Sequence, residues 1–249
     1  MNRRLTLDRF LVAWTTAGGD DLPFPLHYRT TAMWEDEHVA HLRAARAWHR
    51  ESPDPALEHA VRTLLTGEVA VEIYGRSADP ANDVFARAAM AGDRAVLVRQ
   101  DPLARDIHLT TTTTALIAEA MLDLLPAVAA GREPARVAAG REVLEPSATG
   151  SVRRSAGDTG AESIRRLLHR ERSATGSIRI LTYSDPGHAP VTDIGWFDVV
   201  DDGRYLFLPG PDISVVPGTT EAFRRELSTQ VHRLRGVPRT QRRGVMRPH

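Results

Sequence analysis

The stretch Ala91-Gly-Asp-Arg-Ala-Val-Leu-Val98 has a counterpart in Asp201-Asp-Gly-Arg-Tyr-Leu-Phe-Leu208. Each stretch opens with a turn of glycine and aspartate, passes through an arginine and ends in an apolar run. The offset between them is 110 residues, and it shortens to 106 where Ile107 is matched with Ile213. A repeat on this scale is typical of an internally duplicated chain. A chance match of turn, arginine and apolar strand is the alternative.

Similar elements surround the two stretches. Alternation of apolar and polar residues predicts strands, and a spacing of three or four residues predicts helices. Around the first stretch we expect strands at 69–74, 84–90, 94–99 and 106–109, then a helix that ends before Pro126. Around the second we expect a helix at 162–172, strands at 177–183, 193–200, 203–208 and 212–216, and a helix at 220–234. The threonine run 110–114 either extends a strand or caps the helix after it.

Three helices are expected before the first strand. The first covers 6–16, with Thr6 as its cap, and the others cover 35–49 and 55–65. Between the first two, Leu22-Pro-Phe-Pro-Leu26 cannot continue a helix, because proline lacks an amide proton and restricts its neighbour. This segment is predicted to be extended and to lie against the core.

These elements predict an α+β fold. Strands joined by short hairpins favour an antiparallel sheet covered by helices. We therefore expect a pseudo-twofold duplicated, antiparallel-rich sheet flanked by N- and C-terminal helical bundles. Residues 1–235 would form one domain of two related halves, about 1–126 and 127–235. Residues 145–161 are small, polar or charged and predict a mobile loop, and 236–249 predict an arginine-rich disordered tail.

The amino-acid composition excludes several classes of function but does not identify one. The chain has 249 residues, 32 basic against 32 acidic, and contains no cysteine and no lysine. Disulfides, cysteine-ligated zinc, the P-loop lysine and a pyridoxal Schiff base are thereby excluded. No apolar run is long enough to span a membrane, and charged residues interrupt the first 20 positions, so we expect a cytoplasmic protein.

Motifs for catalysis or cofactor binding are not found in the sequence. His38 and His41 could place two imidazoles on one helix face, but a solvated helix face is the simpler interpretation. Paired acids such as Asp20-Asp21 and Asp201-Asp202 fall in predicted turns. We therefore predict no catalytic residue, no cofactor and no metal. The six arginines after residue 232 could neutralise phosphates, but the rest of the chain carries a net charge of minus six.

Two groups of residues resemble the EspG family of type VII secretion. One is Gly176-Ser-Ile-Arg-Ile-Leu-Thr-Tyr183, followed by Trp196-Phe-Asp-Val-Val-Asp-Asp-Gly-Arg-Tyr-Leu206 and a final amphipathic helix. The other comprises an opening leucine-rich helix, the Pro-Phe-Pro-Leu segment at 23–26, and the stretches at 71–76 and 92–97. The resemblance covers nearly the whole chain in order, and the Asp-x-Gly-Arg-Tyr turn is its best single piece.

The resemblance implies a cytosolic chaperone of a type VII (ESX) secretion system and not an enzyme. The resemblance implies a fold with a pseudo-symmetric sheet between helical bundles. It also implies that the protein binds the helical tip of a PPE protein in a PE-PPE heterodimer until export. We expect a PE-PPE-like or related helical substrate, no membrane, no nucleic acid, and either a monomer or a dimer. The alternatives are a hydrolase or transferase with an unrecognised site, and a nucleic-acid-binding regulator that uses the arginine-rich tail.

Strand alternation separates a packing face from a candidate binding face. One parity of the two strands holds Val69, Val71, Ile73, Ile178 and Ile180, which suit packing under helices. The other parity mixes aromatic residues with arginine, a composition that is typical of interface hot spots. It predicts partner contacts at Glu72, Tyr74, Arg76, Arg179, Leu181 and Tyr183. An ordinary solvated sheet face is the alternative.

Overall fold

The computed structural model describes residues 1–30, 32–144, 159–184 and 187–235. The predicted tail 236–249 and most of the predicted loop, 145–158, lie outside the described residues. Residues 159–161 begin a helix instead of ending the loop. The Thr159 hydroxyl accepts a hydrogen bond from the Glu162 amide, and the Thr159 amide donates one to the Glu162 carboxylate, which forms a capping box.

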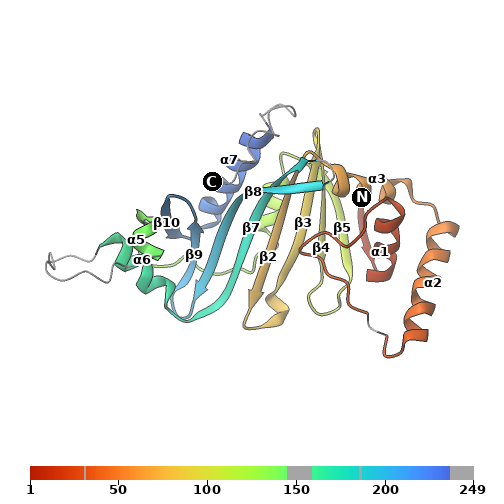
Figure 1. Cartoon of the computed structure of the whole chain (residues 1–249), viewed down its shortest axis with the longest axis horizontal. Helices are drawn as coiled ribbons and strands as arrows, with labels where there is room; N and C mark the ends of the chain where they lie inside the picture. Colours follow the sequence, from red (N-terminus) through yellow and green to blue (C-terminus); the bar gives the residue numbers. More distant parts are fainter. Residues whose placement is uncertain (31, 145–158, 185–186, 236–249) are drawn as a thin grey trace.

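The core of the molecule is one antiparallel sheet of ten strands (Figure 1). Its order is β1-β5-β4-β3-β2-β7-β8-β9-β10-β6. The strands are β1 (Asn2–Leu5), β2 (Val69–Ser77), β3 (Val84–Ala91), β4 (Arg94–Gln100), β5 (Ile107–Thr113), β6 (Arg136–Ala139), β7 (Arg172–Ser184), β8 (Gly187–Val199), β9 (Gly203–Leu208) and β10 (Asp212–Pro217). This sheet and its helices confirm the predicted α+β class.

The strand order is the same in both halves of the sheet. From the centre outward, one half runs β2, β3, β4, β5, β1 and the other runs β7, β8, β9, β10, β6. The turns after β3 and β8 correspond, and each contains one residue with a positive φ, Gly92 at 61° and Asp201 at 58°. This order is what a duplication predicts. The division at about residue 126 stays a proposal.

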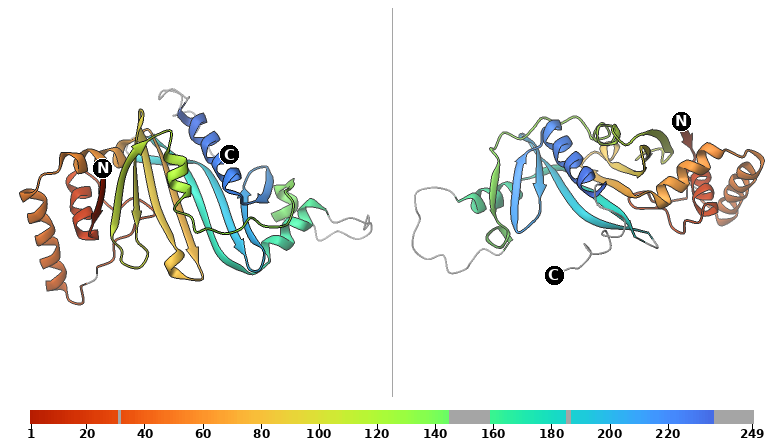
Figure 2. Two further views of the ribbon diagram at one scale, coloured as in Figure 1. Left: turned by 180° about the vertical axis from the view of Figure 1, so that it is seen from behind. Right: turned by 90° about the horizontal axis from the view of Figure 1, so that it is seen from above.

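Helices cover the sheet in three groups. On one face, α4 (Ile117–Leu122) and α7 (Thr220–Arg235) lie over the centre, as Figure 2 shows from behind. On the opposite face, α1 (Leu7–Thr16) and α3 (Pro55–Thr66) pack over the first half, with α2 (Glu35–Glu51) against α1. The second half of that face is covered by α5 (Gly140–Leu144) and α6 (Gly160–Leu168), and a 3-10 turn, η1 (Pro80–Asn82), precedes β3.

Local sequence accounts for several boundaries. Thr6 accepts a hydrogen bond from the Arg9 amide at the start of α1. Asp54 accepts from the Ala56 and Leu57 amides in front of Pro55, and Gly67 ends α3. The threonine run belongs to β5, whose pairing with β4 extends to Thr113, so the strand alternative is the correct one. The helix predicted after it is therefore shorter than expected.

Three elements were not predicted: β1, β6 and α5. The helix expected at 162–172 also ends earlier, at Leu168, and Arg172 already belongs to β7. β1 contains Asn2, Arg3 and Arg4, which have no apolar alternation, and it forms only because β5 offers a paired edge. Pairing with a strand distant in sequence decided β1 and β6.

Candidate partner-binding face

The two parities of β2 and β7 separate as predicted. Val69, Val71, Ile73, Ile178 and Ile180 are all at most 1% exposed and belong to the core under α4 and α7. Residues paired directly across antiparallel strands share a face of the sheet. The alternate residues of both strands therefore lie on the opposite face, between the α1–α3 layer and the α5–α6 layer.

Two of the six predicted contact residues are buried, which corrects that part of the prediction. Leu181 is 4% exposed and packs in the core under α1 and α3, together with Leu57 and Leu64. Glu72 is 2% exposed. The N-terminal helices cover this end of the face, and alternation along a strand does not reveal which helix packs on which side. Neither side chain is available for direct contact with a partner.

The structure brings three of the remaining four together. Tyr74 is half-buried, and the side chains of Arg76 and Arg179 are 57% and 31% exposed. Tyr183 is also half-buried but lies beyond Leu181, toward the end of β7. It is therefore separated from the other three by a residue that the helices cover.

Phe24 completes this surface, although sequence reasoning did not select it. The Arg179 guanidinium lies 4.2 Å from the centroid of the Phe24 ring, and the Phe24 and Tyr74 centroids are 5.4 Å apart. Phe24 is 45% exposed and comes from the Pro-Phe-Pro segment, in which the Phe24–Pro25 bond is cis. We call the surface formed by Phe24, Tyr74, Arg76 and Arg179 the central strip.

A buried aromatic residue supports the central strip from below. Phe85 on β3 is directly paired with Tyr74, and their ring centroids are 5.8 Å apart. The His27 ring meets Phe85 edge-on at 5.1 Å, and the Arg76 guanidinium lies 6.0 Å from its centroid. Such aromatic and cation–π contacts hold large side chains in place before a partner binds.

Glu72 holds the guanidinium groups of two arginines. It is directly paired with Arg87 on β3 and with Arg179 on β7, and it forms ion pairs with both, the second at 2.7 Å. Burial raises the pKa of the Glu72 carboxyl, while the two guanidinium groups oppose that rise. Burial also lowers the pKa of Arg87. Glu72 therefore positions Arg179 from below instead of meeting the partner itself.

A second buried ion pair is structural. Arg204 donates two hydrogen bonds to Asp198, at 2.6 and 2.7 Å, and a third at 3.0 Å to the Pro126 carbonyl. Both side chains are about 5% exposed, so this arginine of the repeated turn fastens β9 to β8 and to the chain after α4. It gives the Asp-x-Gly-Arg-Tyr turn a role in folding.

The described part of the chain contains no group of three or more histidine or acidic side chains arranged to hold a metal ion. His38 instead lies 3.3 Å from the Tyr28 hydroxyl, and His41 lies 3.9 Å from Glu37. None of the helices within the described ranges has the length and apolar character that a membrane span requires.

A model of the EspG family matches residues 6–229 of the chain. Among solved structures, the chain is similar to the Mycobacterium tuberculosis type VII secretion system chaperone EspG5, whose structure was determined in complex with a PE25–PPE41 dimer. The TM-score is 0.61 at 15% sequence identity, and the match covers 90% of this chain and 93% of that chain. No curated protein matches this chain in sequence. At this identity the structural likeness shows the fold.

Proposed function

Because the chain belongs to the EspG family, we propose that it is a cytoplasmic chaperone of a type VII secretion system. Its substrate is the helical tip of a PPE-like protein in a PE-PPE heterodimer, which it keeps soluble until export. The observation that carries this proposal is the shared architecture with a chaperone that was captured with a PE25–PPE41 dimer. It acts by binding and not by catalysis.

The central strip is the surface that we assign to the substrate. It lies between two helical layers, and it combines exposed aromatic area with the guanidinium group of Arg179, which Glu72 and Phe24 hold in place, and that of Arg76, which is paired with Asp83. Aromatic and arginine side chains contribute most of the binding free energy at many interfaces, because they bury a large area and still donate hydrogen bonds. A helical tip would place its apolar side chains on Phe24 and Tyr74.

The test is complex formation between the full chain and a PE-PPE heterodimer from the same genome. Size-exclusion chromatography with light scattering should show a complex, and co-expression should raise the soluble fraction of the heterodimer. Tyr74→Ala should weaken the complex, whereas Arg50→Gln, an exposed position on α2, should not. Failure of every PE-PPE pair of that genome to form a complex would contradict the proposal.

A further inference from the structure

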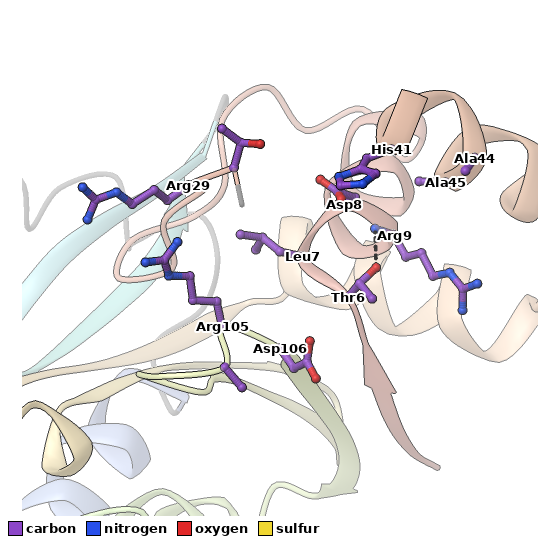
Figure 3. A pocket seen from close by; sticks show the side chains of 12 residues that line it. Thr6, Leu7, Asp8, Arg9, Arg29, His41, Ala44, Ala45, Arg105 and Asp106 are labelled. Carbon is purple, nitrogen blue, oxygen red and sulfur yellow. Dashed lines mark hydrogen bonds between the residues drawn. The ribbon is translucent and has the colours of Figure 1, made fainter. Parts of the chain in front are cut away.

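A second candidate surface lies where α1 and α2 meet the β4–β5 loop (Figure 3). It is a cleft of about 350 Å³. Its lining includes two hydroxyl-bearing residues, Thr6 and Thr30, and both are exposed. Its ionic lining consists of three arginines and two aspartates: Arg9, Arg29, Arg105, Asp8 and Asp106.

The two carboxylates of the cleft already have partners. Asp8 accepts a 2.5 Å hydrogen bond from the Tyr28 hydroxyl. Asp106 accepts a 2.7 Å hydrogen bond from the Nε of Arg4, which brings a fourth arginine to the rim. With Arg4 included, four arginines and two carboxylates surround the cleft, which gives a formal net charge of +2.

The three arginines of the lining differ in their contacts with the described residues. Arg9 stacks on the Trp48 ring at 4.7 Å, and its guanidinium points away from the others in Figure 3. Within the described ranges, the guanidinium groups of Arg29 and Arg105 make no hydrogen bond or ion pair with protein groups. In Figure 3 both guanidinium groups lie on the side opposite Arg9, and that of Arg29 points away from the other labelled side chains.

The backbone of Arg105 supports a role for its side chain. Its φ is 62°, almost the same as that of Gly92, although a side chain makes this region unfavourable by roughly 1 kcal/mol. The turn is held by Asp101, whose carboxylate accepts from the Leu103 and Ala104 amides and whose carbonyl accepts from the Arg105 amide. Glycine would fit this turn with less strain. Arginine occupies this position despite that cost.

We infer that this cleft binds a carboxylate-rich segment of a protein partner, with Arg29 and Arg105 as its recognition residues. Guanidinium groups pair with carboxylates in a bidentate manner. Of the twelve lining residues only Leu7 and Ala45 are buried, whereas small-ligand sites enclose most of their ligand. Leu103, which is 66% exposed in the same turn as Arg105, offers apolar contact next to the charges. The inference does not rest on the function proposed above.

Fluorescence anisotropy of the full chain tests this inference. The probe is a labelled peptide of glutamate and leucine, and its control has glutamine in place of every glutamate. Arg29→Gln and Arg105→Gly should each weaken binding of the glutamate peptide by about tenfold, which is the loss expected for a charge-assisted hydrogen bond. Arg224→Gln, an exposed arginine on α7, removes the same charge elsewhere and should leave binding unchanged.

The variant Arg105→Gly separates recognition from folding. Because glycine relieves the positive φ, its melting temperature should be unchanged or higher while binding is lost. Equal binding of the glutamate and glutamine peptides, or equal affinity of the Arg29 and Arg224 variants, would overturn the inference. Inorganic phosphate that displaces the peptide at equal concentration would also overturn it, since the cleft would then be a general small-anion site.

Discussion

Gly176 of β7 lies directly under the indole ring of Trp196. A Cβ atom built on this glycine would be 2.2 Å from two carbon atoms of the ring, which is too close for any side chain. Gly75, the residue paired with Gly176 across the centre of the sheet, is under the same ring. The indole thus fits over a pair of glycines where the two halves meet, and it is buried in the core under α4 and α7.

We expect Gly176→Ala to destabilise the protein by about 2 kcal/mol, because the indole must move within a packed core. Urea denaturation followed by circular dichroism measures the change. The double variant Gly176→Ala/Trp196→Leu should be less destabilised than the sum of the two single variants, since the smaller side chain relieves the clash with the ring and leaves only that with the Tyr74 carbonyl oxygen, 2.5 Å from the same Cβ. Additive losses would show that the two residues do not compete for the same space.

Tyr74→Ala is expected to weaken substrate binding by about 2 kcal/mol or more, as truncation of an interface hot spot does, whereas Tyr183→Ala, outside the central strip, should weaken it less. The melting temperature should stay nearly unchanged, because both side chains are only half-buried. Calorimetric titration with the PE-PPE heterodimer measures both affinities. Val137→Ala, an exposed apolar residue on β6 at the far end of the sheet, is the matched control. Unaltered affinity, or loss of the fold, would reject this surface.

Glu72→Gln should destabilise the protein by about 3–5 kcal/mol, because it removes the carboxylate that is paired with the buried Arg87 guanidinium. Replacing both partners, as in Glu72→Leu/Arg87→Leu, should recover much of this loss. Chemical denaturation of the two variants tests the prediction. A double variant as unstable as Glu72→Gln would indicate that the carboxylate is needed for more than charge balance.

The stability of the turn that contains Arg105 should depend on pH, because the Asp101 carboxylate holds this turn. Hydrogen bonds, first that from the Ala104 amide, hold the pKa of Asp101 below its usual range. A depressed folded-state pKa means that the stabilisation is present above the unfolded value of about 3.9 and is lost as the pH falls through the folded value. Asp101→Asn should flatten this part of the acid unfolding curve, which denaturation at several pH values measures. An identical pH dependence in the variant would contradict the assignment.

Elements whose signal is local were predictable from the sequence. The β3–β4 hairpin follows from two short, mainly apolar runs around Gly92, and α3 follows from Asp54-Pro55 at one end and Gly67 at the other. β1 and β6 were not predictable, because their polar or short sequences become strands only beside an edge formed by distant residues.

The candidate site was predictable only in part, for the same reason. Alternation placed Tyr74, Arg76 and Arg179 on one face. It could not reveal that Phe24, from a proline-bounded segment, would stack under Arg179, because no periodicity connects the two. The burial of Glu72 and Leu181 likewise depends on strand register and on the N-terminal helices, which are set by tertiary packing.

A single pair of strands joins the two halves at the centre of the sheet. β2 pairs with β7 from Val69↔Thr182 to Ser77↔Ala174, whereas every other strand of each half pairs within that half. While the chain is being synthesised, the first half is complete before β7 exists, and β2 presents an unpaired edge that attracts other strands. The nascent chain is therefore most vulnerable to misassociation in the interval before its own second half arrives to pair with β2.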